Sequence, residues 1–256
     1  MARLALEAAA RAAELAADRA RAEILPRFRR VGVETKQDGS PVTEADRAAE
    51  RAIRAVLREA YPDFGVLGEE YGDEGVRGGR CWVVDPIDGT LAFSRGIPLF
   101  STLIALLDEG EPVLGLIDLP GVGERYVGWK GGGVRRNGEP VRVSQESDPR
   151  SAIVSHGDPF QFDRFGARRG FERMNADFPL LRGYTDAFGH SQVLHGGVAA
   201  MVDPGIHVWD AAPTQILVPE AGGRCATLDR RSDGRGIGLV FGSPALVERL
   251  VDYLRE

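Results

Sequence analysis

Apolar residues recur at helical spacing over the first part of the chain. Leucines and alanines in residues 2–25 repeat every three or four positions, with charged residues between them, and Pro26 follows. This spacing predicts an amphipathic helix that ends before the proline. After a turn-rich segment, GVETKQDGSPVT, a second helix is predicted to begin at Thr43 and to be ended by Pro62.

The middle of the chain changes to strand patterns. FGVLG predicts a short strand that leads into an acidic loop, CWVVD predicts a β-rich strand, and GTLAFSRG predicts a short helix. In residues 100–144 the apolar runs are separated by Glu-Gly and Asn-Gly pairs at hairpin spacing, which indicates an antiparallel meander.

In the remainder of the chain, helix and strand patterns alternate. Strands are predicted in SAIVSHG, PLLRGY, RCATL and GIGLVFG, and helices in residues 160–175, AFGHSQVLHGGVAAMV, WDAAPTQILVPEAGG and SPALVERLVDYLRE. We therefore expect an α/β (α+β) fold. Residues 1–150 should form helices and an antiparallel sheet that carry most of the acidic candidates, and residues 151–256 an α/β lobe packed with them as one body.

Composition narrows the class of protein. A chain of 256 residues can bury a large core, and a net charge of −6 with a pI near 5.4 gives no basic field for nucleic acid or a membrane surface. The sequence has no run of eighteen apolar residues and no export signal. Cys81 and Cys225 form neither a disulfide scaffold nor a zinc motif. These features predict a cytoplasmic protein.

The stretch WVVDPIDGT places two aspartates where an apolar strand ends. Asp85 and Asp88 can point both carboxylates to one side across a bend that Pro86 stiffens, and the carbonyl of Ile87 is left free as a third oxygen. Carboxylates this close repel unless a cation lies between them, and hard oxygen ligands suit Mg²⁺. Gly89 and Thr90 follow at a helix start, where N–H groups bind phosphate. An Asp-Pro turn with a glycine helix entry explains these residues about equally well.

Three further acidic residues have a structural and a functional interpretation. Glu69, in GEE after a short strand, fits a solvated loop. Asp46 stands three residues after Thr43 and fits a capping box, and Asp210, in HVWDAAP, fits a plain N-cap. Gathered with the two aspartates of WVVDPIDGT, they would hold two or three Mg²⁺ ions around a phosphate.

Together these motifs resemble a known family. GEE, DPIDGT and WDAAP, in this order and at these separations, resemble the signature of the inositol monophosphatase superfamily, and TKQDGSPVTEAD is similar to its N-terminal element. The resemblance spans almost the whole chain. It implies the layered αβαβα sandwich of the inositol monophosphatase and fructose bisphosphatase type. It also implies a homodimeric, Mg²⁺-dependent phosphomonoesterase with two or three ions, in which Mn²⁺ can substitute and lithium inhibits.

The resemblance assigns roles to individual positions. The implied metal ligands are Glu69, Asp85, the carbonyl of Ile87, Asp88 and Asp210. Glu69 and Thr90 are implied to position the attacking water, with Asp46 supporting Thr90, so that no protein nucleophile is needed. The N–H groups of Gly89 and Thr90 are implied to hold the phosphate. Lys36 is equally well an electrostatic contact to the site or a solvated loop residue.

The residues after DPIDGT bear on the substrate. F-x-R-G-x-P, with Arg95 where inositol enzymes have a histidine, and VDPG, with Asp203 where they often carry glutamate, are similar to the histidinol-phosphate phosphatase branch. Asp186 lies where that branch has an acidic pocket residue, but Phe188 and His190 replace two of its tyrosines. The implied phosphate- and substrate-binding set is Asp88, Gly89, Thr90, Arg95, Asp186, Asp203 and Asp210.

The resulting hypothesis is a phosphoric monoester hydrolase of histidine biosynthesis. It would convert L-histidinol phosphate to histidinol and phosphate by metal-activated water, with this small phosphate ester as its partner and no nucleic acid or membrane. One alternative is an inositol-1-phosphate phosphatase. The other is an inactive relative that serves as a binding or regulatory module, against which the clustered carboxylates argue, because they repel without a metal.

Overall fold

The computed structural model describes residues 5–30, 32, 34–35, 41–75, 79–229 and 237–255. The helices in these residues are α1 (Leu6–Ile24), α2 (Glu44–Ala60), α3 (Thr90–Ser94), α4 (Pro159–Arg164), α5 (Arg168–Asp177), α6 (Asp186–Leu194), α7 (Val208–Glu220) and α8 (Pro244–Arg255). None of them is long and apolar enough to cross a membrane.

The strands of the described residues form two large sheets and a short ribbon. In chain order they are β1 (Glu34–Thr35), β2 (Pro41–Val42), β3 (Gly65–Gly68), β4 (Gly72–Glu74), β5 (Arg80–Asp88), β6 (Ser101–Asp108), β7 (Glu111–Leu119), β8 (Glu124–Trp129), β9 (Gly133–Arg136), β10 (Glu139–Pro140), β11 (Val154–His156), β12 (Leu181–Arg182), β13 (Ala200–Ile206), β14 (Arg224–Asp229) and β15 (Ile237–Gly242). The eight-stranded sheet has the order β10-β9-β8-β7-β6-β5-β3-β4, and the five-stranded sheet has the order β12-β11-β13-β15-β14.

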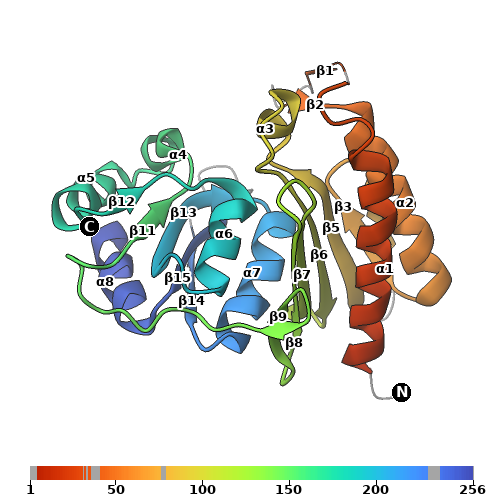
Figure 1. Cartoon of the computed structure of the whole chain (residues 1–256). Coiled ribbons are helices and arrows are strands. Elements are labelled where there is room, and N and C mark those ends of the chain that lie inside the picture. Colours follow the sequence, from red (N-terminus) through yellow and green to blue (C-terminus); the bar gives the residue numbers. More distant parts are fainter. Residues whose placement is uncertain are drawn as a thin grey trace.

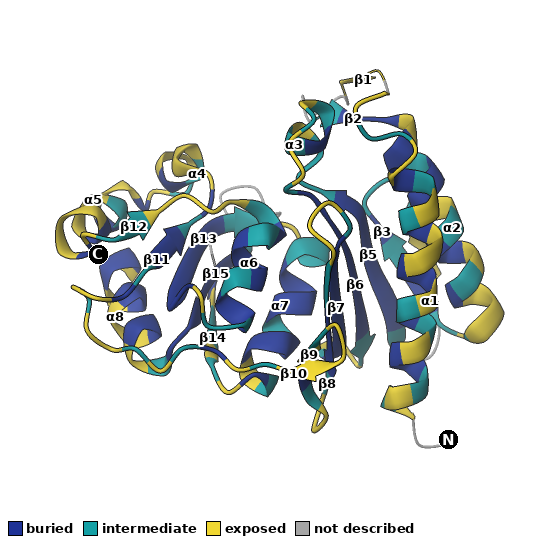
Figure 2. Cartoon of the chain, in the orientation of Figure 1, coloured by how far each residue is buried: buried dark blue, intermediate teal, exposed yellow. Residues whose placement is uncertain are grey.

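Helices and sheets alternate in five layers (Figure 1). Helices α1 and α2 cover one face of the eight-stranded sheet, and α6 and α7 lie between the two sheets. Helices α4, α5 and α8 cover the outer face of the five-stranded sheet. Three buried clusters fill the spaces between the layers, and the sheets are the most buried elements (Figure 2). The expected αβαβα architecture is confirmed.

The pairing of strands agrees with the predicted meander. Strands β5 to β10 follow one another as antiparallel neighbours, and β3 pairs with β5 in parallel. In the other sheet β13 lies between β11, which is parallel to it, and β15, which is antiparallel.

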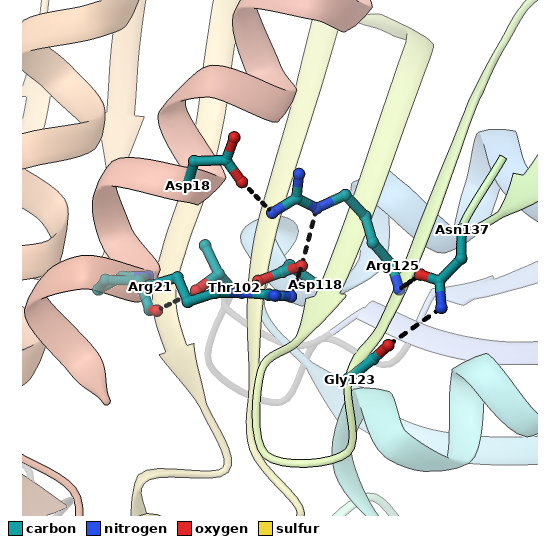
Figure 3. A network of polar contacts seen from close by, with 8 residues as sticks. Asp18, Arg21, Thr102, Asp118, Gly123, Arg125 and Asn137 are labelled. Carbon is teal, nitrogen blue, oxygen red and sulfur yellow. Dashed lines mark hydrogen bonds and ion pairs between the residues drawn. The ribbon is translucent and has the colours of Figure 1, made fainter. Parts of the chain in front are cut away.

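An ion-pair network around a buried aspartate connects α1 to the sheet (Figure 3). Asp118 of β7 is fully buried and accepts hydrogen bonds from Arg21 Nη2 at 2.7 Å and from Arg125 Nε at 2.8 Å. Arg125 also bonds Asp18 at 2.7 Å. Because two arginines face one carboxylate, the buried negative charge of Asp118 is compensated.

Two glycines allow α7 to pack closely on the sheet. Gly115 and Gly128 face each other on β7 and β8. A Cβ on Gly115 would lie 2.8 Å from the carbonyl oxygen of Pro213, and one on Gly128 would lie 2.9 Å from Leu217 Cδ2. Such distances are shorter than van der Waals contact, so any larger residue at these positions would push the helix outward.

Two secondary-structure predictions are wrong in part. The single helix expected at residues 160–175 is two helices, α4 and α5, because Gly166 between them adopts a left-handed conformation with φ 67°. The helix expected in AFGHSQVLHGGVAAMV ends at Leu194, and its last apolar residues belong to strand β13. Gly196, with φ 81°, stops the helix there.

Candidate metal centre

The two aspartates of WVVDPIDGT lie on either side of a bulge in β5. Asp85 pairs with Leu103 and Asp88 with Ser101, so three steps along β5 match two along β6. In a regular strand, residues three apart point to opposite faces, and the extra residue of a bulge removes this opposition. Thr102 Oγ1 fixes the bulge by donating a 2.8 Å hydrogen bond to the carbonyl of Pro86.

Asp210 joins this pair from the first turn of α7. One ligating oxygen from each of Asp85, Asp88 and Asp210 lies within 4.8 Å of the other two. The main-chain N–H of His207 donates to Asp210 Oδ2 at 2.8 Å, which fixes the carboxylate at the helix start. The structure therefore brings together three predicted ligands that are 125 residues apart at the extremes, from 85 to 210.

The hydrogen bonds leave oxygens of these carboxylates for a cation. Asp88 Oδ2 accepts from Ser101 Oγ at 2.9 Å and from the N–H of Ala187 at 2.7 Å, so it is oriented by two donors. Asp85 Oδ1 is buried and has no hydrogen-bond partner in the described part of the chain. A buried carboxylate oxygen without a partner is unfavourable unless a cation completes it.

The pKa values reflect this crowding of acids. Burial, and then the charges of Glu69 and Asp210, raise the pKa of Asp85 well above its usual value. Burial, and then the charges of Asp186 and Asp210, do the same for Asp88. The pKa of Asp210 is raised to about 7, chiefly by burial. All the donors are hard oxygens, so the residues fit Mg²⁺ rather than a thiolate-binding metal.

Glu69 completes the acidic group from the end of β3. Its main-chain N–H donates to the carbonyl of Val84 at 3.1 Å, which places it beside the strand that carries Asp85. The charge of its side chain and a hydrogen bond between the two carboxyl groups contribute to the raised pKa of Asp85. The short strand and the loop after it thus deliver a fourth carboxylate to the site.

A buried ion pair on α2 supports the loop of Glu69, and the sequence analysis missed it. Glu50 is fully buried and bonds Arg54 Nε at 2.7 Å. Its carboxylate accepts from the N–H groups of Glu70 at 2.7 Å and Tyr71 at 3.2 Å. The available signal was a glutamate on the alanine-rich, core-facing side of a predicted helix, where a charge is expected to have a partner.

Asp46 caps α2 and also contacts Thr90. Asp46 Oδ2 accepts from the main-chain N–H of Thr43 at 2.8 Å and belongs to the capping box of α2. Its Oδ1 accepts from Thr90 Oγ1 at 3.2 Å, and the same hydroxyl lies 2.9 Å from the carbonyl oxygen of Ile87. This capping-box residue of α2 therefore also orients Thr90, which lies two residues after Asp88.

Comparison with known proteins shows the family to which this chain belongs. The inositol monophosphatase family matches residues 1–255. The chain belongs to the inositol monophosphatase family.

Its relatives have more than one activity. A histidinol-phosphatase of Chlorobaculum parvum is 36% identical over 97% of this chain and 94% of its own length. A histidinol-phosphatase of Mycobacterium tuberculosis is 38% identical over 77% of this chain and 78% of its own length. The solved structure of an inositol monophosphatase from Zymomonas mobilis is 32% identical, has a TM-score of 0.84 and covers 99% of this chain and all of that chain. The protein is therefore a metal-dependent phosphomonoesterase of the inositol monophosphatase family.

The turn directly after Asp88 requires glycine. Gly89 has φ 78° and ψ 35°, a left-handed conformation, and is the N-cap of the short helix α3. A Cβ at Gly89 would lie 3.0 Å from the carbonyl oxygen of Leu99 and 3.4 Å from Asp186 Oδ2. The N–H groups of Gly89 and Thr90 thus begin α3 directly after Asp88, with Asp186 facing the same turn.

Two further acids predicted to contact substrate, Asp186 and Asp203, interact electrostatically with the acidic group. Asp186 is the first residue of α6 and has φ 56°. Burial, with a contribution from the charge of Asp203, raises the pKa of Asp186. Asp203 of β13 is 5% exposed, and its charge also raises the pKa of Asp210. Asp186 and Asp203, here called the second acidic wall, therefore act by charge on the acids of the candidate metal centre.

The other predicted residues are not part of this acidic group. Arg95 caps the end of α3 and lines a separate cavity of about 400 Å³, together with Arg29, Phe93, Ser94 and Gly96. Lys36 lies outside the described residues.

Proposed function

We propose that this protein hydrolyses L-histidinol phosphate to histidinol and phosphate with Mg²⁺. The observation that carries the proposal is the second acidic wall, Asp186 and Asp203, which adjoins the carboxylates proposed to bind metal. A leaving group with positive charge would offset this negative potential, whereas a neutral polyol would not. Similarity to histidinol-phosphatases over most of the chain supports the same substrate.

The proposed roles follow from the position of each group. The proposed metal ligands are Glu69, Asp85, the carbonyl of Ile87, Asp88 and Asp210. Bound Mg²⁺ would supply an activated water and stabilise charge on the leaving oxygen. Thr90, oriented by Asp46, and Glu69 would direct that water toward phosphorus. The N–H groups of Gly89 and Thr90 would hold the phosphate oxygens.

The leaving group would lie between the phosphate and the second acidic wall. Histidinol carries an amine, which is cationic at neutral pH, and an imidazole, which titrates near neutrality. Asp186 and Asp203 would receive these groups as charge-assisted hydrogen-bond acceptors. Release of the neutral hydroxyl end of histidinol would then leave the phosphate with the metal ligands.

A comparison of two esters tests the substrate. We expect kcat/KM with Mg²⁺ to be at least about tenfold higher for histidinol phosphate than for inositol 1-phosphate, because a buried carboxylate is left without a cationic partner by the polyol. Asp88→Asn should abolish both activities. A higher kcat/KM for inositol 1-phosphate would replace the first proposal by the second candidate, which the similarity to the Zymomonas mobilis inositol monophosphatase favours.

We further propose that the protein is a cytoplasmic homodimer that accepts Mn²⁺ in place of Mg²⁺ and is inhibited by lithium. Light scattering on the purified protein tests the assembly, with a mass near twice the 27.7 kDa of one chain expected. A mass of one chain at micromolar concentration would contradict it.

A further inference from the structure

One buried histidine near the second acidic wall is not part of the proposed metal site. His190 lies in the middle of α6 and is 1% exposed. Its ring packs edge-on against Phe241, with ring centroids 4.8 Å apart. A polar ring in such a position requires partners for its nitrogens.

Both ring nitrogens have a partner, and the two partners come from different elements. His190 Nδ1 lies 2.6 Å from Thr214 Oγ1 of α7. His190 Nε2 lies 3.4 Å from Asp203 Oδ2 of β13. Because an ionised carboxylate only accepts hydrogen bonds, the tautomer that can donate to Asp203 is the one with the proton on Nε2. The threonine hydroxyl fixes the plane of the ring from the other side.

The other oxygen of Asp203 is confined by the backbone. A Cβ on Gly157 would lie 2.4 Å from Asp203 Oδ1, so only a glycine leaves room for the carboxylate there. Asp203 is thus enclosed between Gly157 and His190. The charge of Asp203 raises the pKa values of Asp186 and Asp210, so these carboxylates repel one another, and the contact with His190 holds Asp203 in place.

We propose that His190 is a positioning residue that determines specificity, because it holds the Asp203 carboxylate against the cationic part of the leaving group. The inference rests on the proposed function. It predicts an effect on KM for a cationic ester rather than on the hydrolysis of phosphate esters in general. The ring nitrogens of His190 bond Thr214 and Asp203, and not the proposed metal ligands or the N–H groups proposed to hold the phosphate.

Two amide substitutions separate the two contacts of the ring. In His190→Gln the amide nitrogen can take the place of Nε2 and still donate to Asp203. In His190→Asn the shorter amide reaches only the Nδ1 position beside Thr214, and the contact with Asp203 is lost. A hydrogen bond to a charged group contributes about 1.5–3 kcal/mol, so we expect KM for histidinol phosphate to be about tenfold or more higher in His190→Asn than in His190→Gln.

Three controls define the measurement. The KM of the two variants for β-glycerophosphate, whose leaving group is neutral, should agree within about twofold. The pair His195→Asn and His195→Gln serves as a matched control, because His195 ends the same helix and bonds Gln192 Oε1 at 3.1 Å instead of an acid. Thr214→Val removes the hydroxyl that fixes the ring and should raise KM for histidinol phosphate by less than His190→Asn does. Melting temperatures identify any variant that fails to fold.

The outcomes distinguish this inference from the proposed function. If the wild type hydrolyses β-glycerophosphate but not histidinol phosphate, the proposed function fails, and this inference fails with it. If the wild type hydrolyses histidinol phosphate but both His190 variants have the same KM for it, only this inference fails. A parallel loss of kcat on both esters in both variants would show a purely structural histidine and would also overturn it.

Discussion

Two acidic groups of the protein differ in how their charge is balanced. Asp118, under α1, is fully buried and is bonded by two arginines. Asp85 and Asp210 lie among further carboxylates, and burial together with like charge raises their pKa values. The first group can be compensated within the chain. The second requires a cation from outside the chain. Asp118 and its arginines therefore connect elements of the fold, whereas the acids around Asp85 have the raised pKa values that are typical of functional sites.

Substitution within the uncompensated group should give the largest effect and should change activity and stability in opposite directions. Asp85→Asn removes a proposed ligand and should lower kcat/KM by about 10³-fold or more, since a metal supplies several kcal/mol of transition-state stabilisation. Without metal, the same variant should melt at a higher temperature, because it removes one of the repelling charges. Phosphate release and thermal melting in a chelator measure the two effects.

The exposed residue Asp252 of α8 provides the control for this experiment. Asp252→Asn should leave both quantities unchanged. A metal-free Asp85→Asn protein that melts lower than the wild type would show that the site acids do not destabilise the fold.

Substitution within the compensated group should lower stability. Asp118→Ala leaves Arg21 and Arg125 without their shared partner and should reduce the free energy of unfolding by about 3 kcal/mol. Asp18→Ala, at the 59% exposed end of the same network, should cost less than about 1 kcal/mol. Urea unfolding measures both. Equal losses for the two variants would mean that burial does not distinguish these ion pairs.

The pH dependence of Mg²⁺ binding sharpens the comparison further. The pKa of Asp210 rises from 3.8 to about 7 in the metal-free fold. Its contribution to stability is therefore complete below about pH 3.8 and is lost as the pH rises toward 7. Mg²⁺ needs the ionised form, so its apparent affinity should increase about 100-fold from pH 5 to pH 8.

Thermal shifts with and without Mg²⁺ at each pH test this expectation. The shift should be small at pH 5 and should grow up to about pH 8. A thermal shift that does not change with pH would contradict the raised pKa of Asp210. In Asp210→Asn, the thermal shift caused by Mg²⁺ should depend less on pH than in the wild type.

The smallest expected effect concerns a residue that orients a proposed ligand. Ser101→Ala removes one of the two donors to Asp88 Oδ2 and leaves the N–H of Ala187 in place. We expect about a tenfold loss of Mg²⁺ affinity, in the range typical of residues behind a metal ligand. Thr102→Val, at the next position, removes instead the hydrogen bond to Pro86. Unchanged affinity in Ser101→Ala would show that Ala187 alone is sufficient.

The sequence predicted the acidic group better than the residues that support it. Asp85 and Asp88 were predicted because two carboxylates three residues apart repel without a cation, and the ligand role of Asp210 followed from the resemblance of WDAAP to the family signature. Ser101 and Glu50 act through contacts with residues distant in sequence, and such contacts have no local pattern. The backbone donor of Ala187 leaves no trace in side-chain chemistry at all.

The boundary between α6 and β13 shows that local sequence also leaves part of the fold undetermined. Residues 198–202 are apolar throughout, and a short apolar run fits a buried helix and a central strand equally well. The structure resolves the ambiguity through pairing with β11 and β15 on both sides. The Gly-Gly pair before the run was the available local signal.

Gly115 and Gly128 have a consequence for the distance between the proposed ligands. Helix α7 carries Asp210, whereas Asp85 and Asp88 belong to the eight-stranded sheet on which that helix rests. Because neither glycine has a Cβ, α7 lies close to the sheet, and Asp210 is brought close to Asp85 and Asp88. A single methyl group added at Gly115 would move α7 away from the sheet and Asp210 away from Asp85 and Asp88. The protein would then bind the proposed Mg²⁺ more weakly although every proposed ligand is still present.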